Sequence, residues 1–426
     1  MNKKQLIIIS LSLVLVLTIV FLDRDEEFTG FDSTEEAADS EAWADYFPNE
    51  YEGWKGTEEM VINPDETTYG GAGRYDEDGE VVKMDYLEMY PFLEVAYAGF
   101  PFSESYYRSR GHAYALEDVL ETGRLPDLDE RPGACLSCKS TDVVTGIEEH
   151  GDDFYSMPFS EVVGENTIGC LDCHDHEDAS VKVQRDYVEE GLAHGSFERL
   201  DPESDDLTCA QCHINYHFDP EDAKVTPPWS EGMTVEAQLA HYDETERVND
   251  EWEHEITGAL VGKVQHPEYE TYYEGLESNP HQEMGLSCVD CHMPEQESEE
   301  GEEYDSHLWT SPLTHVEDSC MDCHSNWGEE GVVERAEAVQ SEVYEKQNRL
   351  GEELAEFIEA VGEAREEDDL TDEELEEIQE IHREAQFYWD YVWVENSNGF
   401  HNWPEANRIL DNAEELINEG MELVQN

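Results

Sequence analysis

All ten cysteines of this 426-residue chain fall into five Cys-x-x-Cys pairs, and this feature constrains the fold more than any other. The pairs are Cys135/Cys138, Cys170/Cys173, Cys209/Cys212, Cys288/Cys291 and Cys320/Cys323. In an exported chain, an even number of cysteines usually indicates a disulfide framework. Here the residue after each pair argues for a different use of the thiols. Four pairs are followed by histidine, at His174, His213, His292 and His324, and the first pair is followed by Lys139.

The sequence Cys-x-x-Cys-His is a haem-attachment signal with a chemical basis. The two thiols add to the two vinyl groups on one edge of the macrocycle, and the adjacent histidine reaches the iron. A zinc site would need two further ligands in tetrahedral geometry, and the adjacent histidine is poorly placed to join its own cysteines. One motif would be a weak signal. Four such motifs, together with a fifth Cys-x-x-Cys pair and no spare cysteine, indicate a multihaem cytochrome c with five covalently bound haem c groups.

Lys139 takes the place of histidine in the first motif, CLSCK. The chain has only nine lysines, so chance rarely places one here. A primary amine can ligate haem iron once it is deprotonated, and burial against the metal favours the neutral amine. The sequence therefore predicts one lysine-ligated haem beside four histidine-ligated ones. The alternative is a degenerate motif whose lysine is solvated.

The chain is strongly acidic, with 107 Asp and Glu against 23 Lys and Arg and a formal net charge of −84. The acidic residues are spread over the chain after residue 22 rather than gathered in one tail. Nucleic-acid binding through basic patches is excluded, because phosphate contacts need Lys and Arg. A surface that is acidic throughout is typical of halophilic proteins, which stay soluble in concentrated salt. A merely soluble acidic enzyme is the alternative.

The N-terminal 22 residues form a separate segment. Lys3 and Lys4 precede an apolar run of 17 residues from Leu6 to Leu22. This length is short for a membrane span and long for the core of a cleaved signal. No small-x-small cleavage site and no lipobox cysteine follows. We expect an export signal retained as an anchor, with its basic end inside and the rest extracytoplasmic, in the periplasm or on the outer face of the membrane. Cleavage remains the alternative.

One Cys-x-x-Cys-Lys motif followed by four Cys-x-x-Cys-His motifs resembles the pentahaem ammonia-forming cytochrome c nitrite reductases. The resemblance runs from about Phe47 to the C-terminus, in the order and spacing of the motifs. It implies six-electron reduction of nitrite to ammonium at the haem ligated by Lys139, fed by four haems with two histidine ligands each. Two other functions stay open: a pure electron-transfer cytochrome, and a reductase whose main substrate is hydroxylamine or sulfite.

Three short segments resemble those that carry the family's catalytic residues. Arg110 lies in SRGHAYALEDV, Tyr216 follows the third motif in CAQCHINYHF, and His266 lies in KVQHPEYE. Arginine and histidine can donate hydrogen bonds to nitrite oxygens and supply protons. Tyr216 is expected to stabilise later, partly reduced nitrogen species. Taken singly, each residue is equally compatible with a structural role.

Four further histidines are needed as distal ligands of the bis-histidine haems. The resemblance points to His112, His281, His307 and His401, for haems 3, 5, 2 and 4 respectively. Related reductases also hold a calcium ion beside the active haem. The corresponding residues here are Asn215, Tyr216, Lys263 and Gln265. Asn215 stands where the family has glutamate, and its amide adds no charge, so we expect calcium to bind more weakly.

The predicted fold is mainly α, with five packed haems and long C-terminal helices. Residues 1–22 are the signal or anchor, 23–328 the pentahaem catalytic region, and 329–426 a helical region forming one domain with it. Apolar residues from Val332 to Val361 recur at helical steps. Thr371 and Glu374 form a capping box, and Pro404 suits the first turn of a last helix.

The partners follow from the same resemblance. These C-terminal helices form a homodimer interface in the family, and an intramolecular hairpin is the alternative. The implied electron donor is a membrane-bound, quinol-oxidising multihaem cytochrome, which an N-terminal anchor would keep in the same plane as this chain.

Overall fold

The computed structural model describes residues 28–59, 74–75, 79, 81–195, 204–245, 251–298, 301–367 and 369–425. The expected anchor at residues 1–22 lies outside this part of the chain. Within the described residues, no helix combines the length and apolar character needed to cross a membrane. The fold is mainly helical, as predicted, and its strands are short.

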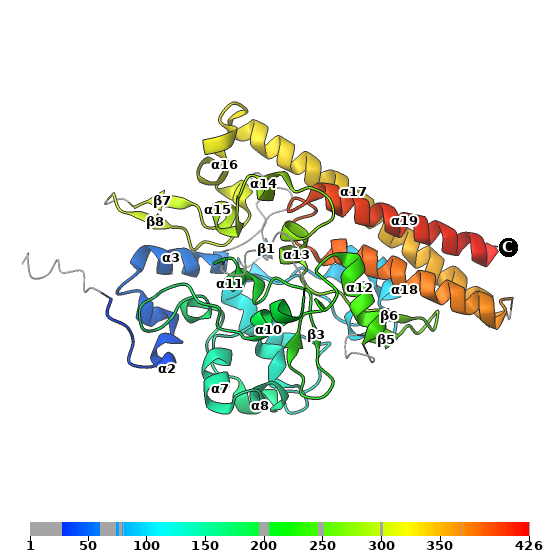
Figure 1. The fold of residues 1–426 in the computed structure, drawn as a ribbon, viewed down its shortest axis with the longest axis horizontal. Coiled ribbons are helices and arrows are strands. Elements are labelled where there is room, and N and C mark those ends of the chain that lie inside the picture. Colours follow the sequence, from blue (N-terminus) through cyan, green and yellow to red (C-terminus); the bar gives the residue numbers. More distant parts are fainter. Residues whose placement is uncertain are drawn as a thin grey trace, which may run out of the picture.

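Three long helices form one side of the molecule (Figure 1). They are α17 (Gly328–Glu366), α18 (Asp372–Val394) and α19 (Trp403–Gln425). The apolar periodicity after Val332 correctly predicts α17. At the start of α18, Thr371 accepts a hydrogen bond from the Glu374 amide, and the Glu374 carboxylate accepts one from Thr371, so the capping box is confirmed. Pro404 lies in the first turn of α19, also as predicted.

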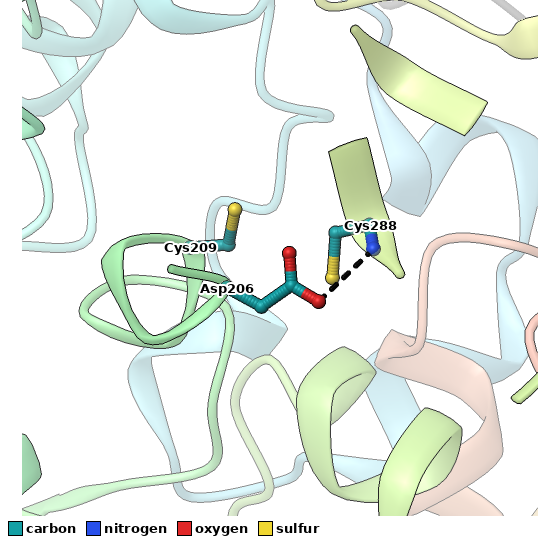
Figure 2. Close-up of side chains that lie close together, drawn as sticks. All are labelled: Asp206, Cys209 and Cys288. Carbon is teal, nitrogen blue, oxygen red and sulfur yellow. Dashed lines mark hydrogen bonds between the residues drawn. The ribbon is translucent and has the colours of Figure 1, made fainter. Parts of the chain in front are cut away.

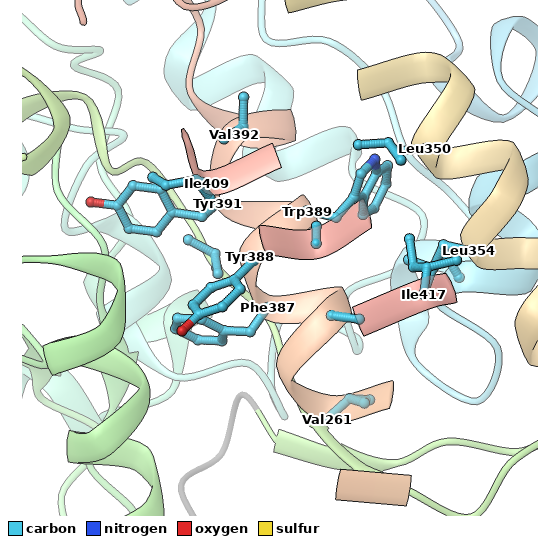
Figure 3. Packing of buried hydrophobic residues seen from close by; sticks show 14 of the residues in the cluster. Val261, Leu350, Leu354, Phe387, Tyr388, Trp389, Tyr391, Val392, Ile409 and Ile417 are labelled. Carbon is cyan, nitrogen blue, oxygen red and sulfur yellow. The ribbon is translucent and has the colours of Figure 1, made fainter. Parts of the chain in front are cut away.

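The largest hydrophobic core lies between these helices and earlier parts of the chain (Figure 3). Leu350, Leu354 and Phe357 of α17 are completely buried, as are Trp389 of α18 and Leu410 of α19. Helix α5 (Phe92–Ala96) packs against α17, and the hairpin of β5 (Glu251–Glu253) and β6 (Leu260–Gly262) packs against α18. The C-terminal helices therefore share one core with residues from the first half of the chain.

The rest of the chain folds into short elements joined by loops. Its other helices are α2 (Thr34–Ala37), α3 (Pro48–Gly56), α4 (Tyr86–Met89), α6 (Ala115–Glu121), α7 (Asp142–His150), α8 (Asp153–Ser156), α9 (Phe159–Val162), α10 (Tyr187–His194), α11 (Leu207–Ala210), α12 (Val235–Glu244), α13 (Glu268–Tyr273), α14 (Pro280–Glu283), α15 (Cys288–His292) and α16 (Val316–His324). Its other strands pair as antiparallel hairpins: β1 (Arg74–Tyr75) with β2 (Val81–Val82), β3 (His217–Phe218) with β4 (Val225–Thr226), and β7 (Glu295–Glu297) with β8 (Glu303–Asp305).

The cysteine motifs lie on these short elements. The first two fall on 3-10 turns at Gly133–Leu136 and Cys170–Asp172, the third begins in α11, and the fourth and fifth are carried by α15 and α16. A second apolar cluster, with Leu136, Phe154 and Trp229 completely buried, packs beside the first and third motifs. Smaller clusters lie at Trp43 and Leu171, and at the start of α17.

Candidate haem centres and active site

Each histidine that follows a Cys-x-x-Cys pair lies opposite a histidine from a distant part of the chain. The ring centroids are 6.2 Å apart for His112 and His213, 6.1 Å for His174 and His307, 6.3 Å for His281 and His324, and 6.1 Å for His292 and His401. These are the eight histidines predicted as axial ligands, in the predicted pairs. The structure brings all four pairs together.

This spacing fits two imidazoles on opposite faces of one metal ion. A ligating histidine nitrogen lies about 2 Å from a first-row metal ion and the ring centroid about 1 Å beyond it, so two such centroids are roughly 6 Å apart. Two other buried histidine pairs are closer, at 5.3 Å for His217 and His241 and 4.8 Å for His254 and His382. In the first of these, the Nε2 atoms of the two rings contact each other at 3.1 Å. The four pairs beside the cysteine motifs therefore form a distinct class.

Backbone carbonyls orient several of these rings. Nδ1 of His174 lies 2.9 Å from the carbonyl oxygen of Ala179, and Nδ1 of His292 lies 3.1 Å from that of Thr310. His307 Nδ1 makes the same kind of contact at 2.8 Å. A proton on Nδ1 that is donated to a carbonyl leaves Nε2 free to bind a metal, which is how ligating histidines are usually held. The donor set therefore fits haem iron.

The cysteines of different motifs lie beside one another. Ligand atoms of Asp206, Cys209 and Cys288 all lie within 4.8 Å of one another (Figure 2). Asp206 accepts a hydrogen bond from the backbone amide of Cys288 at 3.2 Å. The side chains of Cys138 and Cys212 also lie beside each other. The third motif thus contacts both the first and the fourth, and the three-residue cluster in Figure 2 belongs to haem-attachment edges rather than to a separate metal site.

Lys139 is half-buried and lies near the predicted distal ligand His112. Its neighbour Cys138 lies within electrostatic reach of both Lys139 and His266. The structure therefore brings the predicted catalytic histidine close to the motif that carries the lysine.

Glu268, which the sequence did not single out, links His266 to the third motif. Its Oε1 lies 3.6 Å from Nδ1 of His266 and 3.9 Å from Nδ1 of His213. Burial alone would raise the pKa of Glu268, but its interactions with His213 and His266 hold this pKa well below its usual value. The carboxylate therefore lies within electrostatic reach of both histidines.

Arg110 is buried and engaged by carboxylates. Its Nε donates to Asp118 Oδ1 at 2.9 Å, and its Nη2 donates to Glu117 Oε1 at 2.6 Å and to Asp118 Oδ1 at 2.8 Å. Its remaining Nη1 reaches the carbonyl oxygen of Val81 at 3.4 Å. Burial lowers the pKa of Arg110, but the hydrogen bonds to Asp118 and Glu117 raise it further than burial lowers it.

Arg124 has a different environment. Its guanidinium carbon lies 4.0 Å from the ring centroid of Phe102, and its Nη1 donates to the carbonyl oxygen of Ser105 at 3.3 Å. Burial lowers the pKa of Arg124, while Tyr216 and Cys135 are among the nearby groups that raise it. Among the described residues, no carboxylate is bonded to this arginine. It is a half-buried cation near Tyr216 and the first motif, and proximity in space rather than a sequence motif identifies it.

Arg185 joins three cysteine motifs through buried polar contacts. Its Nε donates to the carbonyl oxygen of Ser137 at 2.6 Å and its Nη2 to that of Ser140 at 3.3 Å, and these two serines flank Cys138 and Lys139. The same Nη2 donates at 2.5 Å to Asp172, which lies inside the second motif. Inside the third motif, Gln211 Oε1 accepts from the Arg185 amide at 2.8 Å. Isolated polar residues of this kind leave no periodic pattern in a sequence.

The Asn215 side chain, one of the groups expected to bind calcium, does not fit that ion. Asn215 is completely buried, and its Oδ1 accepts hydrogen bonds from the backbone amides of Tyr216 at 3.0 Å and Gln265 at 2.9 Å. The other expected ligands are the backbone carbonyls of Tyr216 and Lys263 and the side chain of Gln265. Calcium requires several oxygen ligands, usually including carboxylates. The predicted ligand atom of Asn215 instead faces two N–H groups.

Comparison with known proteins places these features in a family. Residues 39–426 match the sequence profile of the family described as Cytochrome c552. The cytochrome c-552 of Parabacteroides distasonis is 31% identical over 414 residues, which is 93% of this chain and 77% of the relative. The cytochrome c-552 of Bacteroides fragilis is 32% identical over 411 residues, covering 92% of this chain and 76% of that protein.

A solved structure is also similar. The cytochrome c nitrite reductase from Desulfovibrio desulfuricans superposes with a TM-score of 0.79 and 27% sequence identity, over 92% of this chain and 87% of that one. Its structure was described for the relevance of two calcium sites in the catalytic subunit.

Proposed function

The chain belongs to the cytochrome c552 family, and we propose that it is an extracytoplasmic oxidoreductase that reduces nitrite to ammonium with six electrons. The proposal is supported by the similarity over nearly the whole chain to a cytochrome c nitrite reductase. It goes further in assigning the chemistry to a haem c held by Cys135, Cys138 and Lys139.

One observation carries the proposal. Four motif histidines each lie 6.1 to 6.3 Å from a second imidazole, an arrangement suited to electron transfer through fully ligated iron. The first motif offers Lys139 instead and has no distal histidine assigned to it. A chain built only to carry electrons has no need of one motif that differs from the other four. Haem c bound there would supply electrons and an open iron position for nitrite.

The surrounding residues bind the anion and hold protons. His266 Nδ1 faces Glu268, so Glu268 fixes the ring and leaves Nε2 to donate a proton. Tyr216 adds a phenol that can donate a hydrogen bond to a reduced nitrogen species. The anion needs a cation, and Arg110 already has two carboxylate partners whereas Arg124 has none among the described residues. We therefore assign nitrite binding to Arg124 and a structural role to Arg110.

The remaining parts of the proposal concern location and partners. The apolar run at residues 6–22 is proposed to anchor the chain on the outer side of the membrane, and cleavage of this run is the competing possibility. A membrane-bound, quinol-oxidising multihaem cytochrome is the proposed donor. A homodimer is proposed through the C-terminal helices. A detergent-free extraction in high salt tests the anchor, and light scattering tests the dimer.

The deciding experiment is product analysis with the haem-loaded protein. With a one-electron reductant, nitrite consumed, ammonium formed and reductant oxidised are expected in the ratio of one to one to six, and an EPR spectrum is expected to show one high-spin haem among low-spin ones. Five low-spin haems and no ammonium would identify an electron carrier. Parallel kinetics with hydroxylamine and sulfite identify the preferred substrate.

A matched pair of variants tests the two arginines. Arg124→Lys is expected to lower kcat/KM for nitrite by roughly 10²-fold, because lysine cannot reproduce the fixed fork of the guanidinium. Arg110→Lys is expected to lower thermal stability and to change kcat/KM less than threefold. The opposite ranking would return the catalytic role to Arg110.

A further inference from the structure

Asn215 links the two segments that carry the proposed catalytic residues. Its Oδ1 accepts a hydrogen bond from the backbone amide of Tyr216 at 3.0 Å and another from that of Gln265 at 2.9 Å. Gln265 immediately precedes His266. The side chain is completely buried, so these bonds face no competition from water. The amide oxygen therefore fixes the Tyr216 segment against the His266 segment directly.

The orientation of the Asn215 amide is unambiguous. Backbone N–H groups only donate, so the atom that faces two of them is the oxygen. The nitrogen Nδ2 then donates to Gln238 Oε1 at 2.7 Å. Gln238 is fixed in turn, because its Nε2 donates to the carbonyl oxygen of Met233 at 2.7 Å, and a carbonyl only accepts. The site thus requires a side chain at position 215 with an acceptor on one side and a donor on the other.

This requirement selects an amide over a carboxylate. A carboxylate at position 215 would turn one of its oxygens toward Gln238 Oε1, so that two acceptors would face each other in a buried place. Burying polar atoms without partners costs about 1–3 kcal/mol. An aspartate at position 215 would therefore conflict with Gln238.

The same contacts disfavour a cation. Two N–H dipoles point their positive ends at Asn215 Oδ1 and occupy its lone pairs. Two buried carboxyls touch the same segments, and both accept hydrogen bonds there, although Glu270 Oε2 is buried without a hydrogen-bond partner among the described residues. Asp390 accepts from Lys263 Nζ at 2.9 Å and from the Val264 amide at 3.0 Å. Glu270 Oε1 accepts from the Asn215 amide at 2.9 Å and from the indole of Trp229 at 3.0 Å.

We propose that the Asn215 amide replaces a calcium ion as the link between the Tyr216 and His266 segments, and that the protein folds and works without calcium. The inference rests on the proposed function only for the roles of Tyr216 and His266. Calcium binding is measured without nitrite. Failure of the calcium proposal can therefore be distinguished from failure of the proposed nitrite reductase function.

The test uses the haem-loaded wild-type protein and needs no variant. After dialysis against EGTA and then against a buffer with micromolar calcium, elemental analysis with haem iron as the internal standard is expected to find less than about 0.1 calcium per chain. A ligand present at 100 times its Kd stabilises the native state by about 2.7 kcal/mol, which would raise Tm by several degrees. We expect millimolar calcium to leave Tm unchanged against EGTA. One calcium per chain, or a rise in Tm of several degrees, would overturn the proposal.

An isosteric variant tests the amide itself. Asn215→Asp keeps the volume and removes the donor toward Gln238, so its Tm in EGTA is expected to fall by several degrees relative to the wild type. Asn215→Ala removes the link altogether, and added calcium is not expected to restore its Tm or its nitrite turnover. An Asn215→Asp protein as stable as the wild type in EGTA, or rescue of Asn215→Ala by calcium, would show that the amide is not the link.

Discussion

Burial in α17, α18 and α19 is mostly apolar, whereas the contacts that join the cysteine motifs are largely polar. The three helices bury Leu350, Leu354 and Ile417 in one continuous cluster (Figure 3). The first three motifs are joined by Arg185, which is 1% exposed and bonded to backbone carbonyls and a carboxylate. Apolar contacts tolerate small shifts, but hydrogen bonds depend on direction and distance. We infer that the helical region supplies bulk stability and that the motif region is built to fix positions.

The largest effect is expected at Arg185. Arg185→Met removes the guanidinium and leaves Asp172 buried without its cation, which typically costs about 3–5 kcal/mol. Because Ser137 and Ser140 flank Cys138 and Lys139, this variant is also expected to shift the reduction potential of the haem that we propose is ligated by Lys139. Guanidinium unfolding and spectroelectrochemistry measure the two effects. A variant that loses stability with all potentials unchanged would reduce Arg185 to a purely structural contact.

A leucine pair on α19 tests the apolar half of the comparison. Leu410 is completely buried, whereas Leu416 is only partly buried on the same helix. Leu410→Ala is expected to lower the free energy of unfolding by about 2–5 kcal/mol, and Leu416→Ala by less than half of that. Nitrite turnover per folded molecule is expected to stay at the wild-type rate in both. A fall in kcat for Leu410→Ala would mean that the helical region also shapes the active site.

Two buried histidines, His254 just after β5 and His382 on α18, give the helical region an acid limit. Burial lowers the pKa of His254 to about 4 and that of His382 to about 3. A histidine in the unfolded chain has a pKa near 6.5. Below this pH the unfolded chain therefore binds protons at these two positions, while the native state does not. Stability is full above pH 6.5 and is lost as pH falls toward 4, by about 3 kcal/mol for His254, whose pKa is lowered from 6.5 to about 4. Charged neighbours include Arg365, which opposes protonation of His254 further.

The pH profile of unfolding checks this expectation. His382→Gln removes one titrating group, so its unfolding free energy is expected to decline less between pH 6.5 and 4 than that of the wild type. Haem absorption recorded in parallel separates this loss from changes at the iron ligands. Identical slopes for the two proteins would exclude His382 as a source of the acid limit.

The smallest effect is expected at the surface of the helices. Arg349 binds Glu353 at 2.8 Å and Glu414 at 2.9 Å, and its side chain is 44% exposed. Exposed ion pairs contribute about 0–1 kcal/mol. Arg349→Ala is therefore expected to change the unfolding free energy by less than 1 kcal/mol, and less still in high salt. A loss of unfolding free energy as large as that of Arg185→Met would contradict the distinction between the buried Arg185 and the exposed Arg349.

The sequence predicted the parts of the fold that carry periodic or local signals. Apolar spacing after Val332, the capping box at Thr371 and Pro404 each mark a helix that the structure contains. The histidines opposite the four motifs were predicted only from the resemblance to a known family, because no sequence spacing connects His112 with His213. The structure places those rings 6.2 Å apart, while their assignment as iron ligands stays a prediction.

Other parts of the site could not be predicted from local patterns. Arg124, Glu268 and Arg185 act through partners that are distant in sequence, and nothing beside them in the chain marks them. The prediction of Arg110 depended on the resemblance of its own segment, whereas the distinction between Arg110 and Arg124 depends on which carboxylates lie within reach. The hydrogen bonds by which Asn215 links the Tyr216 and His266 segments could not be predicted either, because the orientation of the Asn215 amide depends on the orientation of Gln238.

The core between α5 and the C-terminal helices also sets the order in which the molecule can be assembled. Helix α5 ends at Ala96 and packs against α17, so all five cysteine pairs, from Cys135 to Cys323, lie in the stretch of chain that this contact closes. Contacts between residues so far apart in sequence form slowly. Helix α19 follows the other elements of this core in the chain and contributes buried residues that complete it. Each cysteine pair is therefore expected to stay accessible for thioether formation until α19 has joined the core, and a chain cut before α19 is expected to leave that core open.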